Sequence, residues 1–169
     1  MNNLTYLLKK YPDKPWSWCY CVSDNRNLTM EFIEKHPTKP WNWAAISKHP
    51  NITMDIIEKH PDKHWEWRFI SQNPNITMEI IEKYPDKQWD WREISQNPNI
   101  TMDIIEKYPD KPWNWGTWGI SLNPNLTMEF IKKHPDKDWD WRWISRNPNI
   151  TMDIIEKHSD KPWNWAWIS

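Results

Sequence analysis

Tryptophan is the residue type whose number and spacing in this chain point most directly to chemistry. The sequence has 17 tryptophans among 169 residues, and most of them stand in Trp-x-Trp pairs at 16/18, 41/43, 65/67, 89/91, 113/115, 139/141 and 163/165. A regular ladder of indole rings could stack on nucleic-acid bases, on sugars or on a proline-rich peptide. The same rings could instead fill the core between short helices, because each indole buries a large apolar area. We expect the core role for most of them.

Histidine forms a second column of residues that could do chemistry. One repeat position holds His36, His60, His134 and His158, and in other copies Tyr11, Tyr84 and Tyr108. The ligands of one zinc ion must all reach it at about 2 Å, whereas neighbouring helices lie about 10 Å apart. The alternation with tyrosine indicates that the position needs a ring with a polar tip. We therefore predict no metal site.

Lysine forms a third column that could follow a phosphate backbone. Its members are Lys14, Lys39, Lys63, Lys87, Lys111, Lys137 and Lys161. An aspartate precedes all of them except Lys39, and alternating charges are typical of a solvated edge with ion pairs. The formal net charge of −1 also lacks the basic field of a typical nucleic-acid binder. We expect no nucleic-acid partner from charge alone.

The sequence indicates no catalytic arrangement. With only 2 glycines, the chain has no glycine-rich phosphate loop and no nucleophile elbow. Carboxylates recur in regular columns, so no pair of them has a privileged location. Cys19 and Cys21 are best interpreted as reduced thiols rather than as a disulfide framework. We predict a protein that is not an enzyme, with no catalytic residue, metal ligand or cofactor.

These columns arise because the chain is a tandem repeat from end to end. Thr recurs at positions 5, 29, 53, 77, 101, 127 and 151, which divides the sequence into copies at 1–24, 25–48, 49–72, 73–96, 97–122, 123–146 and 147–169. Self-similarity at this period is the signature of a solenoid, in which each unit packs on its neighbours. We predict a single repeat domain over 1–169.

The third copy shows why the first half of each repeat should be a helix. Thr53 is a good N-cap, Asp55 suits the positive end of the helix dipole, and Lys59 lies near the other end. Pro61 ends the apolar pattern of Met54 and its successors. The pattern predicts a two-turn helix over 53–60.

The second half of each repeat contains the tryptophan pair. The residue between the two tryptophans, such as Asp90, is a good N-cap in most copies, and Asp90 with Glu93 resembles a capping box. Pro98 forbids continuation beyond Asn97. We therefore predict an all-α solenoid of helical hairpins. The alternation in Trp-x-Trp also fits a strand, which leaves a strand-plus-helix solenoid of the leucine-rich-repeat kind as the alternative.

Two copies depart from the common pattern in informative ways. The fifth copy is two residues longer and contains both glycines, so we expect it to bend or re-space the stack locally. The last copy keeps the apolar pattern of the internal copies. A terminal repeat without a polar cap exposes apolar surface, and we predict end-to-end self-association there, through a homo-oligomer contact made by Ile154, Ile155, Trp165, Trp167 and Ile168.

Two positions of the repeat vary most among the copies. One lies directly before the first tryptophan and holds His64, Gln88 and Asp138. The other lies in the second helix and holds Phe69, Glu93 and Trp143. Because the rest of the repeat is nearly constant, we predict that these two columns contact a protein partner.

The segment Asn-Pro-Asn-Ile-Thr-Met-Asp-Ile-Ile-Glu-Lys-Tyr-Pro-Asp-Lys-Pro-Trp-Asn-Trp, at 97–115, resembles the short Trp-rich repeats common in proteins of giant DNA viruses of amoebae. The resemblance covers the whole chain, although the first copy departs from it. It implies a role in the virion or in interaction with the host, and hence a location inside the host cell or in the virion. Met1 to Lys10 lacks the features of a signal peptide, and no apolar run approaches a membrane span, so we expect neither secretion nor a membrane.

Two functional hypotheses follow from the sequence. The first is a non-enzymatic repeat scaffold that mediates protein–protein interaction or self-assembly. The alternative is a protein that binds single-stranded nucleic acid or glycans through an aromatic ladder.

Overall fold

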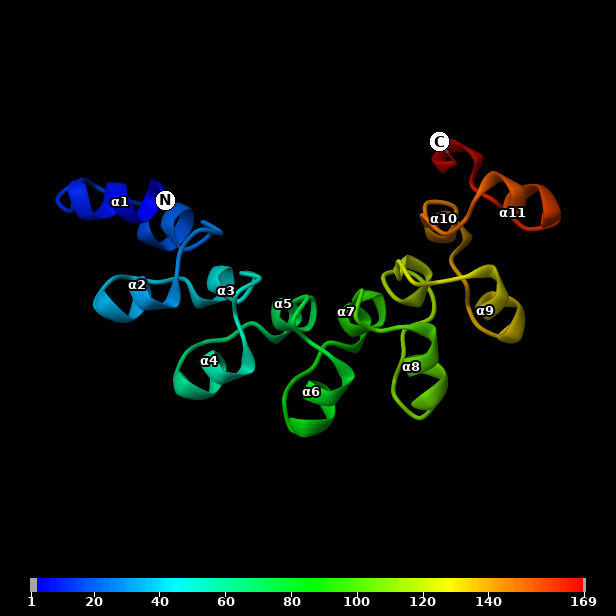
Figure 1. The fold of residues 1–169 in the computed structure, drawn as a ribbon, viewed down its shortest axis with the longest axis horizontal. Coiled ribbons are helices and arrows are strands. Elements are labelled where there is room, and N and C mark those ends of the chain that lie inside the picture. Colours follow the sequence, from blue (N-terminus) through cyan, green and yellow to red (C-terminus); the bar gives the residue numbers. More distant parts are fainter. Residues whose placement is uncertain (1–2, 169) are drawn as a thin grey trace. The chain divides into compact units, whose positions relative to one another are not determined.

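The computed structural model describes residues 3–168, and within that range every regular element is a helix and no strand occurs (Figure 1). The chain divides into two compact units, unit 1 over Met1–Asn75 and unit 2 over Ile76–Ser169. The chain is an all-α solenoid of short helical hairpins, as the capping pattern predicts, and the strand-plus-helix alternative is wrong.

Unit 1 contains six helical elements, each only one or two turns long. They are α1 (Asn3–Lys10), the π-helical turn η1 (Trp18–Val22), α2 (Met30–Lys35), α3 (Trp43–Ile46), α4 (Met54–Lys59) and α5 (Trp67–Ser71). The predicted helix over 53–60 is observed as α4, flanked by Thr53 and His60, but the Thr53 side chain does not make the expected capping hydrogen bond.

Unit 2 continues the alternation with eight elements. They are α6 (Met78–Lys83), α7 (Trp91–Gln96), α8 (Met102–Lys107), the 3₁₀ turn η2 (Ile120–Leu122), α9 (Met128–Lys133), α10 (Trp141–Ile144), α11 (Met152–Lys157) and the 3₁₀ turn η3 (Trp165–Trp167). In both units the first helix of a repeat is an α-helix. The second is either an α-helix or a short 3₁₀-helical or π-helical turn.

Side-chain caps fix where these helices begin. Thr77 Oγ1 accepts a hydrogen bond from the Ile80 amide at 3.4 Å, at the start of α6. Asp90 Oδ1 accepts from the amides of Arg92 and Glu93 at 3.0 and 3.2 Å, at the start of α7. These bonds satisfy amides that have no partner inside the helix. The predicted N-caps of both helices are therefore confirmed in these repeats.

Aliphatic side chains form the centre of each unit, and the indole rings surround it. Ile46 in unit 1 and Ile94, Ile120 and Ile144 in unit 2 are fully buried. Most of the paired tryptophans are half-buried at the boundaries between repeats, and Trp113 and Trp163 are buried there. Burial of aliphatic side chains supplies the general hydrophobic stabilisation, and the indoles join one repeat to the next.

The first tryptophan of each pair closes the preceding helix. Its indole Nε1 donates a hydrogen bond to the carbonyl of the residue five positions earlier, at 2.7–2.9 Å, in the pairs Trp16–Tyr11, Trp41–His36, Trp65–His60, Trp89–Tyr84, Trp113–Tyr108, Trp139–His134 and Trp163–His158. This bond satisfies a carbonyl at the helix C-terminus, where backbone acceptors lack intrahelical partners.

Within each unit, the second tryptophan of a pair contacts the following repeat of that unit. Its ring meets the first tryptophan of that repeat edge-to-face, with centroids 5.3 Å apart for Trp18–Trp41 in unit 1 and 5.0 Å apart for Trp141–Trp163 in unit 2. The perpendicular geometry places the positive edge of one ring on the negative face of the other.

The lysine column combines ion pairs with ring contacts. Lys63 Nζ lies 2.5 Å from Asp62 Oδ2 in unit 1, so the predicted edge of Asp–Lys pairs is observed, and the ammonium lowers the pKa of Asp62. The ammonium of Lys39 also lies 4.8 Å from the centroid of Trp18, in the preceding repeat. This cation–π contact explains why lysine recurs on the tryptophan side of the repeat.

The alternating His and Tyr column reaches back to a glutamate of the preceding repeat. His60 Nε2 lies 3.0 Å from Glu34 Oε1 in unit 1, and Tyr108 Oη donates to Glu82 Oε2 at 2.9 Å in unit 2. Both rings place a polar tip against the glutamate at the same repeat position, and the alternation of His with Tyr predicts such a ring with a polar tip. The column therefore contributes to repeat stacking.

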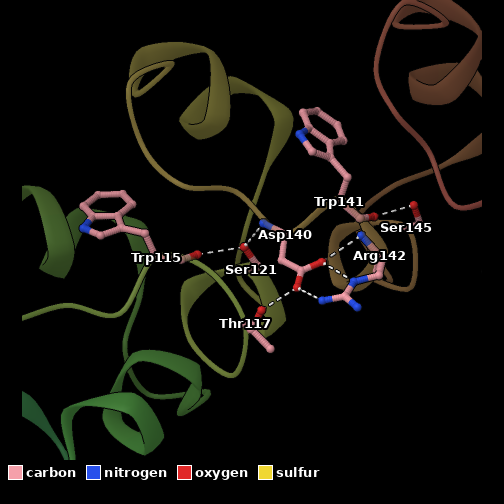
Figure 2. Close-up of polar contacts among 7 residues, drawn as sticks. All are labelled: Trp115, Thr117, Ser121, Asp140, Trp141, Arg142 and Ser145. Carbon is pink, nitrogen blue, oxygen red and sulfur yellow. Dashed lines mark hydrogen bonds and ion pairs between the residues drawn. The ribbon is translucent and has the colours of Figure 1, made fainter.

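Within each unit, a buried serine at the end of a second helix latches one repeat to the next. In unit 2, Ser121 Oγ donates to the Trp115 carbonyl at 2.7 Å and accepts from the Asp140 amide at 3.0 Å (Figure 2). In unit 1, Ser47 donates to Trp43 at 2.7 Å and accepts from Glu66 at 3.0 Å. Because the hydroxyl both donates and accepts, one buried atom satisfies groups in two repeats.

A buried asparagine at the start of the later repeats makes the other polar joint. Asn123 Nδ2 donates to the carbonyls of Asn97 at 3.3 Å and Ile100 at 2.9 Å in the preceding repeat, and to the Ser95 carbonyl at 2.9 Å at the end of the repeat before that. Its Oδ1 accepts from the Asn125 amide at 2.8 Å. This amide side chain thereby satisfies backbone acceptors that stacking removes from water.

Candidate functional site: a row of exposed tryptophans in unit 2

Three tryptophans of unit 2, Trp118, Trp143 and Trp167, lie in contact in one row, which we call the tryptophan strip. Ring centroids are 4.9 Å apart for Trp118–Trp143 and 5.1 Å apart for Trp143–Trp167. Trp118 is 49% exposed and Trp167 is 37% exposed, and Trp143 between them is half-buried. The strip is separate from the edge-to-face tryptophan pairs that join the repeats.

The two tryptophans of the short helix α10 make different contacts. Trp141 packs against Trp163 in the joint, whereas Trp143 contacts Trp118 and Trp167. Successive residues of an α-helix are rotated by about 100°, so residues two apart point to nearly opposite sides. A single turn of helix can therefore hold one ring in the joint and present another at the surface.

Trp118 reaches the strip through the insertion of the fifth repeat. Its φ is 61°, a left-handed conformation that is strained for a bulky residue. Gly119 is required beside it, because a Cβ there would lie 2.0 Å from the Asn114 carbonyl oxygen. Ser121 still makes the latch to Asp140 at 3.0 Å. The insertion forms a bulging loop and leaves this joint in register, so the expected local re-spacing does not occur at the latch.

Arg146 adds a cation to the strip. Its guanidinium carbon lies 5.0 Å from the ring centroid of Trp167 and 5.8 Å from that of Trp143. A guanidinium at this distance is attracted by the negative face of an indole. The strip is thus an apolar row with one positive charge along it.

A polar cluster lies next to the strip residues in the sequence. Asp140 accepts hydrogen bonds from Thr117 Oγ1 at 2.6 Å and from the guanidinium of Arg142 at 2.7 and 3.1 Å (Figure 2). The Arg142 guanidinium, helped by the Thr117 hydroxyl and the Arg142 amide, lowers the pKa of Asp140 to about 2, against the desolvation that would raise it. Asp140 is therefore ionised at neutral pH.

This cluster forms part of a cleft of about 330 Å³ in unit 2, which is also lined by Gly116 and Asp138. Asp138 is exposed. The cleft therefore carries two carboxylates beside one guanidinium, which is unfavourable for a phosphate group.

The same column in unit 1 has a different surface. Ala45 is buried, and Phe69 is half-buried under the ammonium of Lys48, 4.6 Å from its ring centroid. These two side chains form no aromatic row. The strip is thus specific to unit 2, although the joints are alike in both units.

Two larger clefts follow the lysine edge. One of about 370 Å³ in unit 1 is lined by residues that include Lys39, Trp41 and Lys63. The other, of about 600 Å³ in unit 2, includes the equivalent Lys137 and Lys161. Because the same cleft recurs at corresponding joints, we interpret it as a consequence of stacking and not as a distinct site.

The predicted partner-contact residues fall into different environments. His64, Gln88 and Asp138, from the column before the first tryptophan, are exposed. In the second column Trp143 lies at the centre of the strip, and Phe69 is half-buried. Their role in partner contact stays a prediction.

Glu93 is the exception, and the expectation of a surface contact there is wrong. It is 2% exposed, because the third residue of α7 faces inward in its repeat. A partner cannot touch this side chain in the folded protein.

The residues predicted for self-association also differ in exposure. Trp165 is 64% exposed, and Ile154 and Ile168 are half-buried. Ile155 is buried, so its expected surface role is wrong, because it faces the centre of the last repeat as Ile131 does in the repeat before. Trp167 packs back against Trp143.

Trp118 and Arg146 were not among the residues that the sequence singled out. The insertion shifts Trp118 out of the common numbering of the repeat, and Arg146 stands in a column of variable polar residues. The signal that could have found the strip is that Trp143 and Trp167 directly precede a recurring Ile-Ser pair, and that Trp118 precedes the same pair with only Gly119 between them.

Within residues 3–168, no group of three or more His, Cys, Asp or Glu side chains is arranged to hold a metal ion. None of the helices in the described range has the length and hydrophobicity that crossing a membrane requires. Comparison with known proteins found no matching family model, no matching curated protein and no matching solved structure.

Proposed function

We propose that this chain is a non-enzymatic repeat scaffold that binds an extended segment of another protein along the tryptophan strip. The observation that carries the proposal is the contact row of Trp118, Trp143 and Trp167 at the surface of unit 2, with Arg146 over two of its rings. Trp and Arg are the residues that most often dominate the energy of protein interfaces. A contiguous exposed apolar row is also costly unless a partner covers it.

The length of the strip favours a proline-rich segment. Successive centroids are 4.9 and 5.1 Å apart, so the row is at most about 10 Å long, close to one turn of about 9 Å in a polyproline II helix. Such segments dock on aromatic surfaces and lose little conformational entropy on binding. Arg146 then favours an acidic residue beside the prolines.

The alternative, recognition of single-stranded nucleic acid, is supported by the same rings but by little else. The indoles contact one another, so a base cannot insert between them and can stack only on an outer face. Asp138 and Asp140 line the adjacent cleft and repel phosphate groups. We therefore rank nucleic acid second.

Binding of synthetic peptides, measured by tryptophan fluorescence, tests the proposal. A peptide of Pro-Pro-Asp triplets is expected to bind more tightly than one of Pro-Pro-Lys triplets, and an oligothymidylate is the nucleic-acid probe. Trp143→Ala should weaken peptide binding about ten-fold or more. Phe69→Ala, at the equivalent position of unit 1, is the matched control and should leave it unchanged.

Three results would contradict this function. The first is that each peptide binds the Trp143→Ala variant as tightly as it binds the wild type. The second is that neither peptide binds the wild type. The third is that only the oligothymidylate binds, with a strong dependence on salt. The last result would favour the nucleic-acid alternative.

The site of action is a separate proposal that rests on the resemblance of the repeats. We propose that the protein acts in the host cell or in the virion of a giant DNA virus. Detection of the protein in purified virions, or its absence from both virions and infected cells, tests this location.

A further inference from the structure

The last repeat leaves open a face that the repeat before it has covered. Met152 at the start of α11 is 55% exposed, whereas Met128 at the same position of α9 is 5% exposed. Trp165 is 64% exposed, whereas the equivalent Trp141 is half-buried under Trp163. We call Met152, Trp165 and the neighbouring Glu156 the end face.

The covered counterparts of the end face show what chemistry fits it. In unit 2 the partner of Trp141 is the first tryptophan of the following repeat. The partner of Glu82 is the tyrosine hydroxyl of Tyr108 at 2.9 Å, and Glu156 stands at the same repeat position as Glu82. A surface with these groups therefore matches the leading side of another repeat of this kind.

The first repeat carries the groups of that leading side, and its tyrosine is exposed in the described residues. Tyr11 occupies the repeat position of Tyr108 and is 41% exposed. Trp16 occupies the position of Trp41, which packs on Trp18. Lys14 occupies the position of Lys39, whose ammonium lies 4.8 Å from the Trp18 ring centroid.

The charges on the first and last repeats also favour contact between these two surfaces. The last turn of α1 is basic, with Lys9 and Lys10, and its first turn has no acidic residue. The helix α11 of the last repeat has Asp153 in its first turn and an exposed Glu156, against the single base Lys157 in its last turn, so its side chains are net acidic whereas those of α1 are net basic. Opposite charges at the two ends favour association between different ends and disfavour association between like ends.

We propose that the end face of one copy docks on the first repeat of a second copy. Tyr11 then meets Glu156, and Trp16 meets the ring of Trp165, in the register that repeats inside each unit. The contact joins two different surfaces, so it continues from copy to copy instead of closing as a symmetric dimer. This self-assembly does not depend on the tryptophan strip or on the proposed peptide binding.

Association should be weak, because one repeat presents far fewer residues than the 20–30 per side of a stable interface. Sedimentation velocity of the 169-residue chain over the range from about 10 µM to about 1 mM covers the affinities expected of such a contact. The wild type should show an average mass that rises with concentration past that of a dimer.

Two charge variants make the test specific. Trp165→Glu blocks the end face, and Tyr11→Glu blocks the first repeat; both side chains are exposed, so the fold should tolerate the changes. Each variant alone should stay monomeric. Their equimolar mixture should form dimers and stop there, because each dimer contains one intact contact and two blocked ends. Trp118→Ala, an exposed indole of the strip, is the control and should associate like the wild type.

Several outcomes would overturn the proposal. A wild type that stays monomeric through the whole concentration range would do so. So would a Trp165→Glu variant that associates as the wild type does, or a mixture of the two variants that remains monomeric while the wild type associates. Loss of association in Trp118→Ala alone would assign self-assembly to the strip instead.

Discussion

Units 1 and 2 have the same joints and different surfaces. The latch from Ser23 to the Asn42 amide in unit 1 and the latch from Ser121 to the Asp140 amide in unit 2 both measure 3.0 Å. In contrast, the column that holds Ala45 and Phe69 in unit 1 holds Trp143 and Trp167 in the last two repeats of unit 2, where these two rings form a contact row with Trp118.

This difference distinguishes the contacts that hold the repeats together from the surface side chains that vary between them. The joints use polar atoms that stacking buries, and each unmatched group there costs free energy. The side chains of Phe69 and Trp143 in the second-helix column make no latch or asparagine bond, so they can change without breaking those bonds. The strained backbone at Trp118 occurs only in unit 2, and strain of this kind tends to accompany function.

We expect the largest effect from Asn123→Ala in unit 2. The change removes a donor at 2.9 Å from the carbonyls of Ser95 and Ile100; Ile100 keeps a bond from Asn125 Nδ2 at 3.2 Å, whereas Ser95 and the Asn125 amide each lose a side-chain partner. Each unsatisfied buried group costs about 1–3 kcal/mol, part of which water entering the space recovers, so we expect a loss of about 2–4 kcal/mol. Urea unfolding measures this loss.

Asn25→Ala in unit 1 is the matched control for that prediction. Asn25 begins its repeat as Asn123 does, but it is half-buried, and its Oδ1 accepts from the Asn27 amide at 3.0 Å as a local turn bond. Its loss should cost about 1 kcal/mol. Equal losses in the two variants would contradict the idea that the inter-repeat bonds carry the larger share.

The helices of both units could be predicted from local sequence. Thr before most of the first helices and Asp or Asn before most of the second helices determine where the helices begin, as Thr77 and Asp90 show. Proline determines where the second helices end. These signals act within a few residues, so they are visible without knowledge of the stacking.

The latches and the strip could not be predicted in the same way. Ser121 is an ordinary helix-end residue in the sequence, and its bond to Asp140, 19 residues later, exists only once two repeats stack. Glu93 shows the opposite kind of failure. A charged residue at a variable position is expected to be exposed, but the Glu93 side chain is buried. Trp118 depends on a two-residue insertion whose backbone path no repeat pattern specifies.

Acid should weaken unit 2 through Asp140. Arg142 lowers the pKa of Asp140 from 3.8 to about 2, so its stabilising bonds are present above about pH 4 and are lost as the pH falls through about 2. Because Arg142 is largely exposed, we expect a contribution of about 1–2 kcal/mol. Urea unfolding of the wild type and of Asp140→Asn, compared at about pH 5 and pH 2.5, should show a smaller acid loss in the variant.

Unit 1 should respond to milder acid through His49. Its ring is buried where later repeats have asparagine, and Nε2 has no hydrogen-bond partner within the described residues. Burial lowers its pKa below 6.5, and the nearby Arg26 adds to this, whereas the Ser23 carbonyl and Asp24 oppose it. The folded state thus disfavours the proton, and stability should fall as the pH drops below 6.5.

The variant His49→Asn restores the residue of the later repeats and cannot take up a proton. Its stability should change less than that of the wild type between about pH 7 and pH 5. Identical slopes for the two proteins would show that His49 does not titrate in the folded state any differently from the unfolded chain.

The smallest effect is expected from giving unit 1 a single indole. Phe69→Trp places an indole in the same column, beside Lys48 instead of Arg146 and with Ala45 in the repeat before. At a half-buried surface position the change should alter stability by less than about 0.5 kcal/mol. Because the strip of unit 2 is a row of contacting rings and one ring spans only a fraction of a polyproline turn, the variant should still bind one Pro-Pro-Asp peptide per chain. A stoichiometry of two in calorimetry would mean that a lone indole suffices, and the contact between Trp118, Trp143 and Trp167 would then be irrelevant to recognition.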